Sequence, residues 1–160
     1  MQTTPPPWTI PRDSADAFAV EDSMGFVVNR LARLFAAALQ ERLAPLNLTT
    51  GAFPVLLALW AEDGISQRTI AQRLPLDETT LVRTLDRMER DGLVHRARDT
   101  ADRRRIVVRL TDHGRGLKEP ALAAAEAVNA VALGGLAPDA TDAVREAMRR
   151  MVAALAADTA

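Results

Sequence analysis

Apolar residues recur at helical spacing in the first half of the chain. Between residues 22 and 43 a single apolar residue or an adjacent apolar pair recurs every three or four positions, at Met24, Val27, Leu31, Leu34, Phe35, Ala38 and Leu39. This spacing places them on one face and predicts an amphipathic helix that ends before Pro45. A second helix is predicted from a cap at Thr49 or Thr50 to about Glu62. It is apolar almost all round between Phe53 and Trp60, so we expect it to be buried.

Two short capped helices are predicted next. Ser66 can cap the first and Asp77 the second, and in each case an apolar residue before the cap is matched by one four positions inside the helix. These apolar pairs are Ile65 with Ile70 and Leu76 with Leu81. Gly92 ends the second helix. Two helices joined by a Leu-Pro-Leu turn have the outline of a helix-turn-helix.

After Gly92 the spacing of the apolar residues changes from that of a helix to that of β-strands. Residues 93–98 and 106–110 are short and rich in β-branched or alternating positions, which predicts a β-hairpin with a polar, basic tip over residues 99–105. Thr111 then caps an Ala-rich helix to about Leu133, which we expect Pro120 to kink. A last helix starts at Pro138, with apolar positions at Val144, Met148, Met151, Val152 and Leu155.

The N-terminal segment and the composition narrow the class of protein. Residues 1–20 are rich in Pro and polar residues, so we expect a disordered or extended arm, with Trp8 as a possible anchor. The chain has no Cys and only two His, which excludes thiol chemistry and disfavours metal sites. With no signal peptide and no long apolar run, we expect a cytoplasmic protein without membrane contact, cofactor or metal.

Charge is distributed unevenly along the 160 residues. The net charge is −1, yet residues 66–110 hold 11 arginines against 7 acidic residues, a formal excess of four positive charges. A basic segment inside an acidic chain favours contact with an anionic polymer, although an Arg-rich solvated face would have the same composition.

The predicted helix over residues 78–91 separates these alternatives. Leu81, Leu85 and Met88 form one narrow apolar face, and the opposite side carries Thr79, Arg83, Arg87 and Arg90, with Asp86 nearby. A solvated face usually mixes both signs in i,i+4 pairs, whereas Arg suits guanine edges and phosphates. We therefore predict that this face contacts DNA.

The hairpin tip has a second cluster of cations. Arg103, Arg104 and Arg105 follow one another on a projecting loop, from which they can reach a minor groove or flanking phosphates. Asp99 and Asp102 could instead neutralise two of them, and both roles are compatible.

The same residues carry a family resemblance. The run Leu81-Val82-Arg83-Thr84-Leu85-Asp86-Arg87-Met88-Glu89-Arg90-Asp91-Gly92-Leu93-Val94, the segment 99–105 and Leu110-Thr111-Asp112-His113-Gly114 together resemble the MarR family of bacterial transcription regulators. The resemblance runs from about Asp22 to Leu155. It implies a dimeric winged helix-turn-helix protein of mostly α structure, with a recognition helix over Asp77–Asp91 and a wing over Arg96–Arg109.

The resemblance also implies roles for single residues. Arg83 would contact base edges, Arg103 would enter the minor groove, and Asp102 and Arg104 would brace the wing. The full set of predicted DNA-contacting residues is Ser66, Gln67, Arg68, Thr79, Thr80, Arg83, Arg87, Arg90, Arg103, Arg104 and Arg105. The absence of Cys excludes the peroxide-sensing branch of the family, and the absence of Tyr excludes its tyrosine-rich pockets.

The expected domain organisation follows from the segments that lie outside the winged helix. Residues 1–20 would be the arm, 21–48 a dimerisation helix, 49–110 the DNA-binding domain and 111–158 further dimerisation helices. The flanking helices have apolar stripes but no second core, so we expect them to pack against a second copy of the chain, although they could wrap their own domain instead. A homodimer would bind a palindromic operator.

Catalysis is not expected, because no Ser, Cys or carboxylate group accompanies either His in a catalytic arrangement. Two classes of function remain. The first is a repressor released from its operator by a small aromatic anion such as an aromatic carboxylate. The residues predicted to bind that ligand are Phe26, Arg30, Arg33, Phe53, Trp60 and His113, although such aromatic residues are more often core. The alternative is a winged-helix protein–protein module without a specific DNA site.

Overall fold

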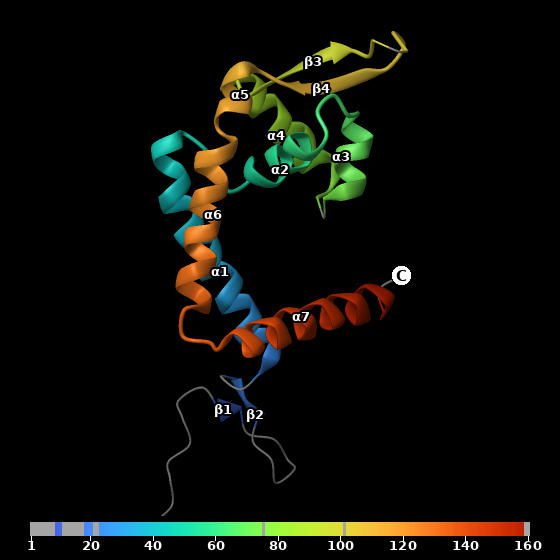
Figure 1. The fold of residues 1–160 in the computed structure, drawn as a ribbon. Coiled ribbons are helices and arrows are strands. Elements are labelled where there is room, and N and C mark those ends of the chain that lie inside the picture. Colours follow the sequence, from blue (N-terminus) through green and yellow to red (C-terminus); the bar gives the residue numbers. More distant parts are fainter. Residues whose placement is uncertain (1–8, 11–17, 21–22, 75, 101, 159–160) are drawn as a thin grey trace, which may run out of the picture. The chain divides into compact units, whose positions relative to one another are not determined.

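Figure 1 shows the computed structural model of the chain, which describes residues 9–10, 18–20, 23–74, 76–100 and 102–158. The chain divides into two compact units, residues 1–124 and 125–160, and each is described by itself. Trp8 and most of the predicted arm lie outside the described residues. Within the arm, β1 (Thr9–Ile10) pairs antiparallel with β2 (Phe18–Ala19).

The first unit has the predicted winged helix-turn-helix order. Its helices are α1 (Met24–Leu43), the short 3₁₀ helix η2 (Ala44–Leu46), α2 (Phe53–Ala61), α3 (Gln67–Arg73) and α4 (Glu78–Arg90). The hairpin strands β3 (Val94–Arg98) and β4 (Ile106–Leu110) follow, and then α5 (Asp112–Gly116). The mostly helical fold class with one small hairpin is confirmed.

The remaining helices continue toward the C-terminus. Helix α6 (Lys118–Leu133) begins in the first unit and ends in the second, which also contains α7 (Pro138–Asp158). Among the described residues, no single helix is long and apolar enough to cross a membrane. Residues 112–133 and 138–158 meet that criterion only when taken together as a bent pair.

The core of the first unit lies under α4. Leu81, Leu85 and Met88 of α4 are at most 1% exposed, which confirms the apolar face. Around them the other fully buried large side chains are Leu43, Leu48, Val55, Leu56, Leu59, Ile70, Val107 and Val108. All faces of α2 except that of Leu57 contribute to this core, as its apolar sequence indicates. The core thus fixes which side of α4 remains in solvent.

Helix starts follow the predicted caps with one correction. Ser66 Oγ accepts a hydrogen bond from the Thr69 N–H at 3.1 Å, and Asp77 Oδ1 accepts one from the Thr80 N–H at 2.8 Å. The predicted cap of α2 at Thr49 or Thr50 is wrong, because α2 begins only at Phe53. Thr49 Oγ1 instead accepts from the Ala52 N–H at 3.2 Å and closes the turn before the helix.

The wing is anchored at its base. Strands β3 and β4 pair from Val94 with Leu110 to Arg98 with Ile106, and Ile65 adds a bridge to Val108. At the end of β4, the Leu110 N–H donates to Asp63 Oδ1 at 2.8 Å. The hairpin therefore joins the body through β4 and the segment before α3.

The single long helix predicted from Thr111 is divided. Thr111 caps only α5, accepting from the Gly114 N–H at 3.0 Å, and the helix breaks at Leu117 before α6. Pro120 explains the position, because it has no N–H for the carbonyl of Gly116 and its ring crowds that carbonyl. The kink thus lies one turn before the proline.

Candidate nucleic-acid interface

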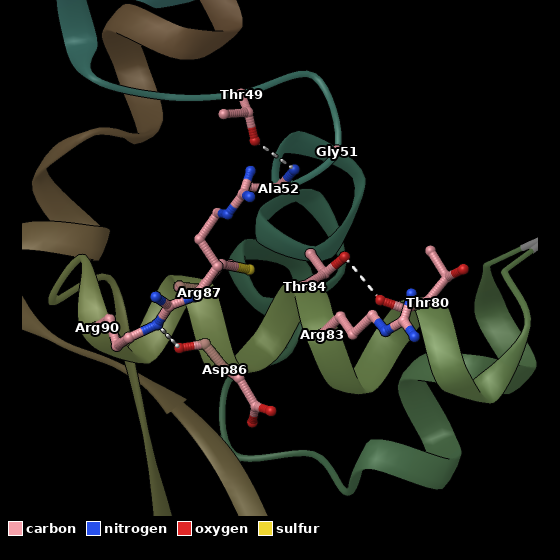
Figure 2. A pocket seen from close by; sticks show the side chains of 10 residues that line it. Thr49, Gly51, Ala52, Thr80, Arg83, Thr84, Asp86, Arg87 and Arg90 are labelled. Carbon is pink, nitrogen blue, oxygen red and sulfur yellow. Dashed lines mark hydrogen bonds between the residues drawn. The ribbon is translucent and has the colours of Figure 1, made fainter.

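The outward face of α4 presents the predicted basic side chains. Thr79, Arg83, Arg87 and Arg90 are all exposed, opposite the buried stripe of the same helix. Figure 2 shows this side of α4 facing the loop of Thr49, Gly51 and Ala52. Between them lies an open hollow of about 530 Å³, whose lining is completed by Thr80, Thr84, Asp86 and Met88.

The cations of this face differ in their partners. Arg90 Nε donates to the backbone carbonyl of Asp86 at 3.3 Å, which holds it along the helix. Among the described residues, neither Arg83 nor Arg87 forms an ion pair with an acid. These two guanidinium groups are therefore exposed without internal neutralisation, an arrangement that suits contact with phosphates or base edges.

The acid on this face has a partner outside α4. Arg96 of β3 places Nη2 at 2.7 Å from Asp86 Oδ1 and Nη1 at 2.5 Å from Glu89 Oε2. The Arg96 backbone N–H also donates to Glu89 Oε1 at 2.9 Å. This backbone hydrogen bond, together with the side-chain hydrogen bond and charge of Arg96, holds the pKa of Glu89 below its ordinary value, although partial desolvation of the carboxylate acts to raise it. Sequence reasoning missed this cluster.

The start of α3 adds polar groups beside α4. Gln67 and Arg68 line a second open hollow of about 560 Å³, together with Asp77 and Glu78 at the start of α4. The Ser66 hydroxyl is engaged in the cap and lies 2.8 Å from Thr69 Oγ1. Of the three predicted contact residues here, Arg68 is the exposed cation.

The wing tip exposes all three predicted arginines. Arg103, Arg104 and Arg105 are exposed, and Asp102 Oδ1 accepts from the Arg104 backbone N–H at 3.0 Å. Arg98 Nη1 donates to the Arg103 carbonyl at 2.8 Å. Asp102 thus stabilises the turn by binding the backbone N–H of Arg104. The guanidinium of Arg104 does not take part in this contact.

The predicted ligand-binding residues do not line one hollow. Phe53 is 6% exposed and packs edge-on against Trp60, with ring centroids 6.2 Å apart. Trp60 Nε1 donates to the Gly114 carbonyl at 2.9 Å, which ties α2 to α5. Phe26 and Arg30 instead line an open hollow of about 360 Å³ on α1, with Val27, Leu31 and Leu34. Arg33 and His113 are exposed and line neither of these features.

Comparison with known proteins gives a consistent result. The MarR family model matches residues 48–106. Over 103 residues the chain is 43% identical to the HTH-type transcriptional regulator TtmR of Methylorubrum extorquens strain PA1, which covers 64% of this chain and about half, 53%, of that protein.

A second relative is matched over more of its length. The organic hydroperoxide resistance transcriptional regulator of Bacillus subtilis strain 168 is 32% identical over 107 residues, covering 67% of this chain and 73% of that protein. Among solved structures, BpsR of Bordetella bronchiseptica superposes with a TM-score of 0.76 at 27% identity, over 84% of this chain and 96% of that one. Its description concerns regulation of DNA binding by 6-hydroxynicotinic acid.

The family match spans α2, α3, α4, β3 and the arginine-rich tip of the hairpin. The relatives are named as transcriptional regulators and not as enzymes. On sequence and fold together, the chain belongs to the MarR family of winged-helix transcriptional regulators.

Proposed function

We propose that this chain is a homodimeric regulator that binds double-stranded DNA in a sequence-specific manner. The observation that carries the proposal is the exposed, unneutralised pair Arg83 and Arg87 on α4, in the same unit as the arginine-rich wing. Arg83 would contact base edges in the major groove, with Thr79 and Thr80 near the helix start. Arg103 would enter the minor groove, and Arg68, Arg87, Arg90, Arg104 and Arg105 would contact phosphates.

Exposed apolar side chains support the dimer. On α1, Met24, Val27 and Leu34 are each more than two fifths exposed, and α7 leaves Val152 and Leu155 about two thirds exposed. Large aliphatic side chains in such number favour burial against a second copy of the chain. A twofold dimer would place two copies of α4 on one face of a duplex, and the operator would be an inverted repeat. Such a regulator would act in the cytoplasm, where the chromosome lies.

The mode of regulation belongs to the same proposal. We propose that the chain is a repressor and that an aromatic anion releases it from its operator. The candidate anion site is the hollow on α1, which Phe26 and Arg30 line together. The name of the BpsR ligand, an aromatic carboxylic acid, supports this class of effector. The B. subtilis relative is named for hydroperoxide resistance, but this chain has no Cys, so cysteine oxidation is not carried over.

Selection of bound duplexes from a random pool tests DNA recognition. The expected product is an inverted repeat with half-sites about one helical turn apart. A pool that yields no preferred sequence would favour the protein–protein module instead.

Titration of aromatic acids into the protein–DNA complex tests regulation. An effective acid should weaken binding by about 5–150-fold, and Arg30→Ala should lose that response while it retains unliganded DNA binding. If Arg30→Ala responds like the wild type, the site on α1 is wrong.

A further inference from the structure

We propose that Arg96 is a positioning residue that fixes the wing on the recognition helix and removes Asp86 from the DNA-facing arginines. The inference rests on the proposed function, because it concerns how two DNA-contacting elements are held together. It assigns a role to a residue that the predicted contact set does not include.

Three contacts join Arg96 to α4. Its guanidinium reaches Asp86 Oδ1 at 2.7 Å and Glu89 Oε2 at 2.5 Å, and its backbone N–H donates to Glu89 Oε1 at 2.9 Å. Asp86 and Glu89 are one helical turn apart, so a planar guanidinium can span both carboxylates. The side chain of Arg96 is only 29% exposed, which makes the pairing stronger than that of fully solvated ions. We name these three residues the Arg96 clamp.

The clamp has a defined place in the wing. Arg96 pairs with Val108 in the hairpin register, and Val108 is the residue that Ile65 bridges from the other side. The Val108 N–H donates to the Ile65 carbonyl at 2.9 Å. Ile65, Val108 and Arg96 thus form a row across the hairpin. Through this row β4 is joined to the segment before α3, and β3 is joined to α4. Among the described residues, the hydrogen bonds of Asp102–Arg105 all stay within the hairpin. This row therefore holds the middle of the hairpin on α4, in addition to the hydrogen bonds of Leu93 and Leu110 at its base.

The clamp also affects the net charge of the α4 surface that we propose faces DNA. Asp86 lines the same hollow as Arg83, Arg87 and Arg90 (Figure 2). On a helix it stands three positions after Arg83 and four before Arg90, the spacings at which an acid pairs with an arginine. Because Arg96 occupies the Asp86 carboxylate, that carboxylate is not free to neutralise the cations that would face phosphates.

The test is a double-mutant cycle on a duplex that the wild-type chain has selected from a random pool. The cycle combines Arg96→Ala with Arg103→Ala, and Kd is measured for all four proteins. In the wild-type background we expect Arg103→Ala to weaken binding about tenfold. With Arg96→Ala present, the same change should cost less than about threefold, because the wing is no longer held toward the DNA. Equal losses in both backgrounds would overturn the clamp, and so would an Arg103→Ala variant that binds like the wild type.

Further variants separate the clamp from lost stability or lost charge. Arg73→Ala removes an arginine from the surface ion pair with Glu62 and should leave Kd nearly unchanged. Removing the freed carboxylate, in Arg96→Ala with Asp86→Asn, should recover affinity relative to Arg96→Ala alone. A double variant that binds no better than Arg96→Ala would refute the shielding role. Should Arg96→Ala fail to fold, Glu89→Gln replaces it in the same cycle and decides the result.

Different results would overturn the proposed DNA-binding function and the Arg96 clamp. A wild-type chain that selects no duplex would overturn the proposed function, and this inference with it. A wild-type chain that binds its selected duplex, combined with a cycle that shows no coupling, would overturn the clamp alone.

Discussion

Asp86 shows how a single residue can mislead a helical-wheel argument. On the wheel it lies near the arginine face, beside Thr79 and Arg90, and weakens the case for a basic face. In the structure its carboxylate is engaged by Arg96 of β3, ten positions along the chain. The wheel describes one helix only, so a charge supplied by another element could not be seen in it. The apolar face, which depends on spacing within the helix, was predicted correctly.

Arg83 is predicted to contact bases and not phosphates alone. Arg83→Ala should then cost roughly 1–3 kcal/mol on the selected duplex and relax preference at one position of each half-site. Binding to a scrambled duplex should change much less. Fluorescence anisotropy on both duplexes measures the two losses, and Arg145→Ala on α7 serves as the charge-matched control. Equal losses on the two duplexes would make Arg83 a phosphate contact.

Asp63 should make stability depend on pH. Burial acts to raise its pKa, but hydrogen bonds from the Leu110 N–H and from Arg115 outweigh this and leave the pKa lowered. A lowered folded-state pKa gives stability that is present above the ordinary carboxyl pKa and is lost as pH falls through the folded value.

Asp63→Asn tests this dependence, because the amide keeps an acceptor for Leu110 without a titrating group. Urea unfolding at a series of pH values should show a shallower loss of stability below about pH 4 in the variant than in the wild type. Parallel profiles for the two proteins would show that Asp63 does not contribute.

At the scale of helices and strands, local signals placed most boundaries. The caps at Ser66 and Asp77 and both hairpin strands lie where the sequence predicts them, because each depends on residues within a few positions. The predicted start of α2 was wrong, and the kink expected from Pro120 lies one turn before it, at Leu117. Both lie near prolines, Pro54 and Pro120, whose constraints act on the preceding turn as well as on the proline itself.

Gly114 is expected to be essential for the packing of α5. A Cβ at this position would lie 2.2 Å from the Leu93 carbonyl oxygen, a backbone atom that cannot move aside freely. Gly114→Ala should therefore destabilise the fold by about 2 kcal/mol or more.

Gly116, in the same short helix, provides a matched control, because a Cβ there meets nothing within 4 Å. Gly116→Ala should be neutral or stabilise by up to about 1 kcal/mol. Thermal unfolding of both variants measures the difference. Similar melting temperatures for the two would contradict the close approach of α5 to Leu93.

For the whole molecule, sequence reasoning located the candidate DNA contacts better than the candidate ligand contacts. The predicted DNA-contacting residues were identified as exposed cations on α4 and on the wing, and each of these elements is formed by residues close together in the sequence. The ligand set required residues from α1, α2 and α5 to meet, which depends on long-range packing that spacing does not encode. The buried Phe53 packs against the half-buried Trp60, whereas Phe26 and Arg30 lie at a separate hollow.

Dimer formation should depend on the apolar stripe of α7. Met148→Asp or Leu155→Asp would place a carboxylate in the proposed interface, where an unpaired charge is costly. We expect a shift to monomer in analytical ultracentrifugation and a fall in DNA affinity, although no DNA-facing residue has changed. Ala153→Asp, on the opposite face of α7, should leave both properties intact. A monomeric variant that binds the full operator as tightly as the wild type would refute the coupling.

Discrimination between DNA sequences is the central claim, and the ratio of two dissociation constants measures it most directly. Kd of the wild-type chain is determined for its selected inverted repeat and for a scrambled duplex of the same length, across a range of salt concentrations. We expect the chain to bind the inverted repeat at least about 10³-fold more tightly than the scrambled duplex near physiological salt, with steep salt dependence on both duplexes. Equal dissociation constants for the two duplexes would contradict it.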